Sequence, residues 1–348
     1  MEKTRKRRPG LYRTLAIVVI GLMIWLATMY PPIRPHVQLP AEPLSPTLFE
    51  FAGQPFTITN TFVAAVIAEL FLILIAFLIN RQIKQGKMVV EGISGVFALL
   101  LEGIYGLTES TAGKWTKKIF PIFATITMLL FAVNLMELIP GVDSIGLLHP
   151  SEHGNPVQEL LPGFSTIVKG ETPTDTAAAG EHAEHGSAEL YGLYPFVRVA
   201  STDLSFTVAL AIVAVLAIQW IGLKALGMKY TRKYLDLSGL VDAWKKPGCG
   251  GPLGLIMGFV QAVVVGPLEI VAEISKIISF AFRLFGNIFA GAIVLFVMGA
   301  LGYFLQTPFL LLELIVGLIQ AFVFGVLTMV FMSMATQSHD DHAEESHH

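Results

Sequence analysis

The sequence predicts an all-α polytopic membrane protein with about six membrane helices. Two observations lead to this fold class, and a third excludes a disulfide-based scaffold. The 348-residue chain is 54% hydrophobic and only 14% charged, whereas a typical soluble domain carries about 25% charged residues. Its apolar residues form long runs, and its basic residues cluster in a few of the segments between those runs. Its single cysteine excludes an intrachain disulfide framework.

Six hydrophobic regions account for most of the chain. Each of the first four is long enough to cross a hydrocarbon core of about 30 Å, and they cover residues 12–31, 59–80, 119–140 and 203–226. The last two regions, 253–301 and 303–336, are too long for upright spans. We expect two helices of about 50 Å each that tilt steeply and form a hairpin. Gly266-Pro267 is expected to break the fifth region near its start.

The basic residues predict the topology. Segments 1–13, 81–118 and 224–246 carry six Lys or Arg each, whereas 31–58 and 141–202 carry one and two. Because cytoplasmic loops are enriched in Lys and Arg, both termini are predicted to be cytoplasmic and the acidic loop 141–200 to lie outside. The chain then divides into three parts: residues 1–58 (an N-terminal segment and outer linker), a core at 59–337 and a His/acid-rich cytoplasmic tail at 338–348.

Two segments leave alternatives open. The basic, then apolar, N-terminus suits either an uncleaved membrane anchor or a signal-like segment; we favour the anchor, because no small-x-small cleavage site follows. Residues 89–115 mix apolar residues with Gly, Glu and Thr. They suit an interfacial helix at the cytoplasmic surface or a polar hairpin that contacts a peripheral subunit.

The fifth region carries an unusual charge, Arg283, with at least sixteen mostly apolar residues after it. A cation at bilayer depth is costly and therefore indicates function. At 100° per residue, five polar residues fall within an arc of roughly 80°: Glu269, Glu273, Lys276, Arg283 and Asn287. Ser275 and Ser279 are expected to lie off this stripe. A polar face that only packs within the subunit is the alternative.

Further polar residues lie in or near the other regions. Glu313 and Gln320 are seven positions apart in the sixth region, so they share a helix face. Glu137 and Asp143 lie near the end of the third region and Asp203 begins the fourth; each is either a solvated interfacial residue or part of a polar path.

One acid has no motif. Glu69 lies well inside the second region. It either pairs with a partner subunit or reaches the lipid headgroups through a helix tilt.

The motifs FRLFGNIFAG, PLEIVAEISK and IQAFVFGVLTMVFMSMA resemble subunit a of the rotary ATP synthases, and NLMELIPG and DLSFTVALA are similar to its third and fourth core spans. The resemblance covers roughly residues 59–337. It implies a bacterial stator subunit that provides two aqueous half-channels to the carboxylates of a c-subunit ring, coupling a proton gradient to rotation and ATP synthesis. The arginine that matches Arg283 separates the half-channels and attracts the ionised ring carboxylate.

The resemblance also implies roles for individual residues. Asn287 and Gln320 match the polar partners of the arginine; Glu269, Ser275 and Ser279 match the inner half-channel. Glu137 and Glu313 match acids of the outer half-channel, to which we add Asp203 from the fourth span. Ala292 stands where many members have an acid or a histidine, so Glu313 lacks that relay partner.

The implied partners are the c ring, b-type peripheral stalk subunits, the soluble ATPase head and the lipid bilayer, with no nucleic acid. The implied location is the bacterial inner membrane. The chain has no GxxxxGK[ST] phosphate loop, so we expect a non-catalytic subunit of the enzyme.

No cofactor or metal is expected. All nine histidines lie outside the predicted spans, which argues against haem ligation inside the bilayer; a metal at HAEH or in the tail is a minor alternative. The competing function is a secondary proton-coupled transporter, which should show inverted repeats. A purely structural assembly protein would not need an aligned charged stripe.

Overall fold

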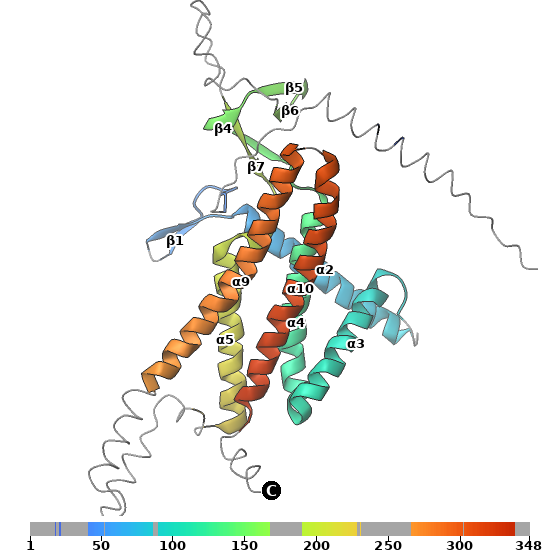
Figure 1. Cartoon of the computed structure of the whole chain (residues 1–348), viewed down its shortest axis with the longest axis vertical. Helices are drawn as coiled ribbons and strands as arrows, with labels where there is room; N and C mark the ends of the chain where they lie inside the picture. The colour runs from blue at the N-terminus through green and yellow to red at the C-terminus, as the bar shows by residue number, and fades with distance from the viewer. Residues whose placement is uncertain are drawn as a thin grey trace, which may run out of the picture.

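The computed structural model describes residues 41–51, 53–85, 90–167, 190–227, 266–301 and 303–337, together with positions 18, 21 and 230. Within these residues the protein is mainly helical. Four helices lie side by side in a bundle, namely α4 (Thr116–Leu135), α5 (Leu204–Leu226), α9 (Gly266–Leu301) and α10 (Tyr303–Ala335). Figure 1 shows α2 (Asn60–Lys84) crossing this bundle obliquely, with α3 (Ile93–Ala112) beside it.

Five helical stretches of the described residues are long and apolar enough to cross a membrane. One of these stretches joins α3 to α4. The bounds of α2, α4, α5 and α10 agree with the predicted regions at 59–80, 119–140, 203–226 and 303–336 to within about five residues. The first predicted region, 12–31, lies outside the described residues apart from two positions, as does the start of the fifth, 253–265. The described part of α9 starts at Gly266, so the break expected at Gly266-Pro267 stays a prediction.

The core lies where α4 packs against α10 and α9 packs against α5 and α10. Fully buried side chains from three of these helices fill it, including Phe123, Leu130, Leu284 and Phe324. Gly325 of α10 brings the helices close, because a Cβ there would overlap the Thr127 hydroxyl of α4. Small residues allow such close approach between membrane helices.

One end of the bundle carries β-strands, and we call it the strand end. Here β4 (Gly146–Asn155) pairs with β7 (Tyr191–Pro195), and β5 (Val157–Leu161) pairs with β6 (Phe164–Ile167), both antiparallel. A separate hairpin joins β1 (Phe49–Phe51) to β2 (Gln54–Phe56). The sequence did not predict these strands. Many of their side chains are exposed, so the strands lack the apolar alternation that would have indicated them.

Short elements complete the strand end. Strand β3 (Pro140–Asp143) and the 3-10 turns η2 (Met136–Leu138) and η3 (Ala200–Thr202) connect α4 and α5 to the strands. The end of α4, the start of α5 and the connection from α9 to α10 all lie at this end in Figure 1. The opposite end holds the start of α4, the end of α5, the start of α9 and the end of α10.

Candidate functional site

Arg283 lies near the midpoint of α9 with its side chain exposed. Its guanidinium donates a long hydrogen bond of 3.4 Å from Nη2 to Ser279 Oγ. Within the described part of the chain, no carboxylate forms an ion pair with it. Arg283 is therefore a cation on an uncovered face of a long apolar helix, able to attract an anion from outside the subunit.

A polar bridge joins the two long helices one turn beyond Arg283. Asn287 Nδ2 of α9 donates a 2.7 Å hydrogen bond to Gln320 Oε1 of α10. Gln320 is 4% exposed, and its buried Nε2 has no hydrogen-bond partner among the described residues. This geometry is consistent with the prediction that both amides lie close to the arginine. The Nε2 group of Gln320 is a buried donor that can still bind an acceptor.

Glu313 lies on α10 about two turns from Gln320, toward the strand end. It is 7% exposed, and its buried Oε1 has no partner among the described residues. The carboxylate lies directly against Gly291 of α9, where an added Cβ would overlap it. Gly291 therefore makes the space for this acid, and Ala292 beside it brings no second titratable group.

Two further acids lie at the strand end, and one of them, Glu137, is close to Glu313. Glu137, on η2, is half-buried and interacts electrostatically with both Glu313 and Asp143. Acids from η2, β3 and α10 are thus grouped near one end of the bundle, although they are far apart in the sequence. Such a group can hold and exchange protons.

Outside the spans, burial shifts the acids of this end toward their neutral forms. It raises the pKa of Asp143 to about 6, although Arg198 and a backbone hydrogen bond to Val199 act in the opposite direction. Burial also raises the pKa of Glu42, which accepts a 3.1 Å hydrogen bond from Asn60 Nδ2. Sequence reasoning missed Glu42, because its neighbours Asn60 and Asp143 are distant in the sequence.

A buried asparagine fixes α10 between Glu313 and Gln320. Asn134 Nδ2 of α4 donates a 3.0 Å hydrogen bond to the carbonyl of Gly317 on α10. Its Oδ1 accepts a 2.7 Å bond from Ser201 Oγ on η3. The sequence analysis did not select Asn134 or Ser201, since neither carries a charge and the contact spans much of the chain.

Asp203 has a clear local role in the structure. It is the N-cap of α5, where its Oδ1 accepts a 2.9 Å hydrogen bond from the Ser205 amide. Its Oδ2 accepts a 3.0 Å bond from Thr61 Oγ1 at the start of α2. An N-cap of this kind satisfies an otherwise unpaired amide. Asp203 thereby joins two helices, and its part in proton transfer stays a prediction.

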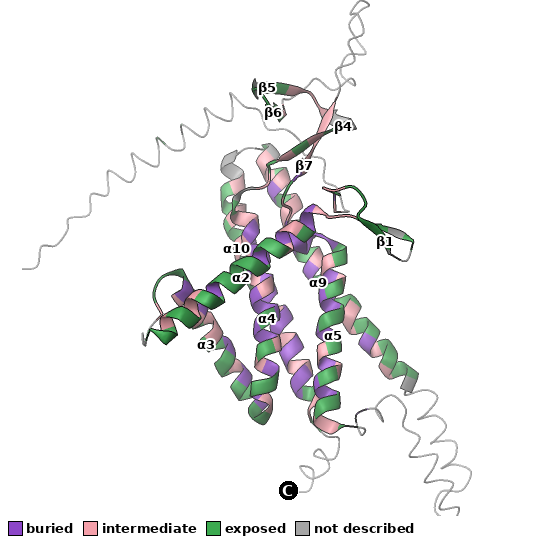
Figure 2. Cartoon of the chain, turned by 180° about the vertical axis from the view of Figure 1, so that it is seen from behind, coloured by how far each residue is buried: buried purple, intermediate pink, exposed green. Residues whose placement is uncertain are grey.

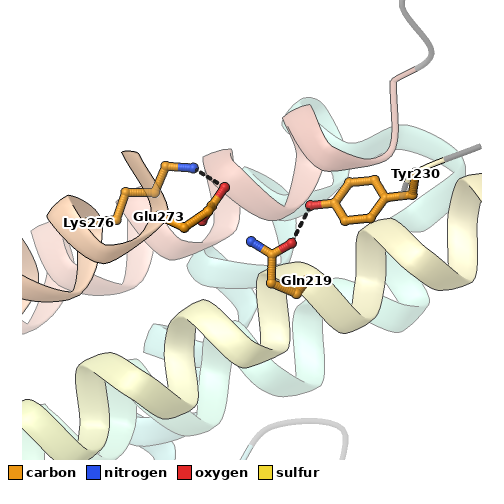
Figure 3. Close-up of polar contacts among 4 residues, drawn as sticks. All are labelled: Gln219, Tyr230, Glu273 and Lys276. Carbon is orange, nitrogen blue, oxygen red and sulfur yellow. Dashed lines mark hydrogen bonds and ion pairs between the residues drawn. The ribbon is translucent and has the colours of Figure 1, made fainter. Parts of the chain in front are cut away.

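The predicted single stripe on α9 divides in two. Glu273 is buried, faces α5 and forms a 2.8 Å ion pair with Lys276. Figure 3 shows this pair near Gln219 of α5, which accepts a 2.8 Å hydrogen bond from Tyr230. Gln219, Tyr230 and Glu273 line one side of an open, mostly apolar pocket between α5 and α9.

The second part of the stripe lies on the exposed face. Ser275, Ser279, Arg283 and Asn287 follow one another at intervals of four residues and are all exposed. Ser279 was expected to lie off the predicted stripe, yet it accepts the 3.4 Å hydrogen bond from Arg283, because a step of four residues turns a helix by only about 40°. Glu269, in the first turn of α9, is half-exposed.

No group of three or more His, Cys, Asp or Glu side chains that could hold a metal is found among the described residues. The HAEH segment and the tail 338–348 lie outside them. The described polar groups are suited to passing protons or attracting a charged partner.

The fold and the site define a polytopic helical membrane protein with a buried acid cluster and an arginine on an open helix face. A sequence model described as the ATP synthase A chain matches residues 61–333. The chain belongs to this family, whose members form the stator subunit of the ATP synthase.

Several similar proteins are named ATP synthase subunit a. The protein of Moorella thermoacetica is 26% identical over 289 residues, covering 82% of this chain and 94% of the relative. That of Mycobacterium ulcerans is 24% identical, covering 82% of this chain and 89% of the relative. That of Pseudoalteromonas translucida is 30% identical, covering 72% and 75%. The likeness extends across the membrane helices.

Proposed function

We propose that this chain is the non-catalytic, proton-translocating subunit of a rotary ATP synthase. The observation that carries the proposal is Arg283, a cation at the middle of α9 with no carboxylate partner among the described residues. A buried or lipid-facing cation needs an anion or water. The anion would come from the ring of c subunits, each with a carboxylate that passes the exposed face of α9.

The outer half-channel reaches the ring from the strand end. Glu313, Glu137, Asn287 and Gln320 line it, with Asp203 at its margin. The support is that two acids interact electrostatically there and that Glu313 Oε1 and Gln320 Nε2 are buried with no partner among the described residues. Protons would pass through Glu313 toward the ring carboxylate, while the Asn287–Gln320 bridge keeps the polar path beside the arginine.

The inner half-channel begins at the opposite end of the bundle. Ser275 and Ser279 are exposed on the face that carries Arg283, and Glu269 lies in the first turn of α9. Arg283 lies between the two groups along the helix. Its positive charge would release the proton from an arriving ring carboxylate and prevent direct passage of protons between the half-channels.

The bacterial relatives support the location of the subunit, and the distribution of basic residues supports its orientation. We place it in a bacterial inner membrane, with both termini and the tail 338–348 in the cytoplasm and the strand end outside. Residues 1–58 would supply the anchor and outer linker to the core at 59–337. The b-type stalk subunits would connect it to the soluble ATPase head. Family membership favours this assignment over a self-contained transporter.

The direct test is purification of the intact complex through a tag on this chain. An oligomeric c ring and a soluble ATPase head should co-purify. Vesicles that contain the complex should then acidify upon ATP addition in a sodium-free buffer, which separates proton from sodium coupling. Isolation of the chain alone, with proton-coupled solute uptake, would instead support a transporter.

A further inference from the structure

Helix α2 carries an acid that the proposed function does not use. Glu69 is exposed, and it forms no hydrogen bond or ion pair with any described residue. It lies nine positions after Asn60, which puts it about 13 Å along the helix from the strand end. In a hydrocarbon core of about 30 Å, that is close to the middle.

The orientation of α2 prevents Glu69 from turning inward. At the strand end, Asn60 Nδ2 bonds to Glu42 Oε2 and to the Pro195 carbonyl at 3.1 and 3.3 Å. At the other end, Gln82 donates to Ser94 Oγ at 2.9 Å. The helix is therefore held at both ends, and its rotation is fixed.

Glu69 belongs to an exposed stripe on the far side from the bundle. At 100° per residue, five exposed residues fall within an arc of about 60°, and they are Phe62, Glu69, Ile73, Ala76 and Asn80. The buried side of α2, formed by Ala64, Ala68 and Ile75, points more than about 90° away. Figure 2 shows the largely exposed outer side of α2.

A carboxylate and an amide on a lipid-facing stripe are costly without partners. We infer that this stripe, which we call the Glu69 stripe, binds a membrane helix of another subunit that presents a lysine, an arginine or another hydrogen-bond donor to Glu69. Charge complementarity selects this occupant over lipid tails, which offer no donor. Ala76 allows the close backbone approach that such helix pairs use. The inference rests on the proposed function only in that the chain is part of a membrane complex.

Loss of the carboxylate should release the partner. We expect Glu69→Leu to lower the amount of one membrane subunit that co-purifies with the tagged chain by about tenfold or more. Leu74→Gln is the matched control, since Leu74 is 53% exposed on a different side of α2 and should retain every subunit. Because Glu69 has no partner within the described chain, the variant should insert into the membrane in normal amounts.

Photo-crosslinking in the wild-type complex identifies the partner. A photoreactive phenylalanine at Phe62 or Ile73 should crosslink to that same subunit, whereas one at Ile67 or Leu74 should not. Replacing the facing basic residue of the partner with glutamate, together with Glu69→Lys, should restore binding. Full retention of all subunits by Glu69→Leu, or crosslinks to lipid alone from Phe62 and Ile73, would overturn the inference.

The two proposals can fail separately. If no c ring and no ATPase head co-purify with the wild-type chain, the proposed function is wrong, but crosslinks from Phe62 and Ile73 still report whether a helix covers α2. If the ring and head co-purify and the Glu69 stripe meets only lipid, the inference alone is wrong.

Discussion

At the scale of single residues, Gly291 controls where the Glu313 carboxylate can lie. A Cβ at position 291 would overlap that carboxylate, and the buried Oε1 has no hydrogen-bond partner among the described residues. Overpacking a tight site costs about 1–3 kcal/mol. A glycine on α9 is thus placed opposite the only carboxylate on α10.

Gly291→Ala should therefore slow ATP-driven proton pumping in membrane vesicles while the complex still assembles. The added methyl group displaces the carboxylate from its position between α9 and α10. Shortening the acid as well, in Gly291→Ala with Glu313→Asp, should recover part of the rate. Gly106→Ala is the control, because a Cβ there meets no atom within 4 Å. Equal pumping by Gly291→Ala and Gly106→Ala would show that this packing is unimportant.

Glu313 should carry more of the proton relay than Glu269. It is buried with no second acid at position 292, whereas Glu269 is half-exposed. Removing a general acid or base typically costs about 100-fold or more, so Glu313→Gln should slow proton flux by at least about tenfold and Glu269→Gln by less. Passive proton flux through complexes stripped of the ATPase head measures both. A larger defect in Glu269→Gln would reverse the assignment.

At the scale of elements, the height of α10 relative to α4 decides where both Glu313 and Gln320 lie. Asn134 makes this connection through the carbonyl of Gly317 and the hydroxyl of Ser201. Neither contact was predictable from local sequence, because polar side chains that bond to a distant backbone carbonyl leave no periodic signal.

Asn134→Ala should both destabilise the subunit and slow proton flux. It leaves the buried Ser201 hydroxyl without its acceptor and removes the second hydrogen bond to the Gly317 carbonyl, at a cost of about 1–3 kcal/mol. Ser333→Ala is the matched control: its hydroxyl donates a 3.0 Å bond to the Thr111 carbonyl of α3, at the far end of α10. We expect the control to lower thermal stability with normal flux per assembled complex. Similar flux in both variants would limit Asn134 to a structural role.

The orientation of α9 and α10 can be mapped by thiol labelling. On the proposed topology, cysteines at 313 and 320 should react with a membrane-impermeant reagent from the outer face, and one at 269 from the inner face. The native Cys249 is first replaced by serine. Labelling of these positions from the opposite sides would show that the half-channels have been assigned in reverse.

At the scale of the whole molecule, hydrophobicity predicted the helices well and the strands not at all. The four described regions that were predicted agree with α2, α4, α5 and α10, because apolar runs of this length have few alternatives in a bilayer. The strands between Pro140 and Pro195 mix exposed with half-buried side chains, and β4 pairs with β7 across a long stretch of chain, so no regular alternation in the sequence marks them. The division of the α9 stripe depends on packing against α5, which helical periodicity alone cannot reveal.

The arrangement of the helices also predicts how each of them is tilted in the membrane. Helix α2 crosses the bundle obliquely (Figure 1), so α2 and the bundle helices cannot all stand upright in one membrane. Helices α9 and α10, with 36 and 33 residues, exceed a core of about 30 Å. We therefore expect α2 to be the more upright and α9 and α10 to be the steeply tilted ones, following the curve of the ring.

The most direct test of the central claim is gradient-driven ATP synthesis by vesicles that contain Arg283→Ala. With the cation removed, nothing should attract the ring carboxylate or separate the half-channels. ATP synthesis and ATP-driven pumping should both be lost, with a passive proton leak in their place. Arg283→Lys should restore little of the lost ATP synthesis. A lysine is a point charge without the planar fork of a guanidinium, and it can lose its proton when it is desolvated. Normal ATP synthesis by Arg283→Ala vesicles would contradict the account.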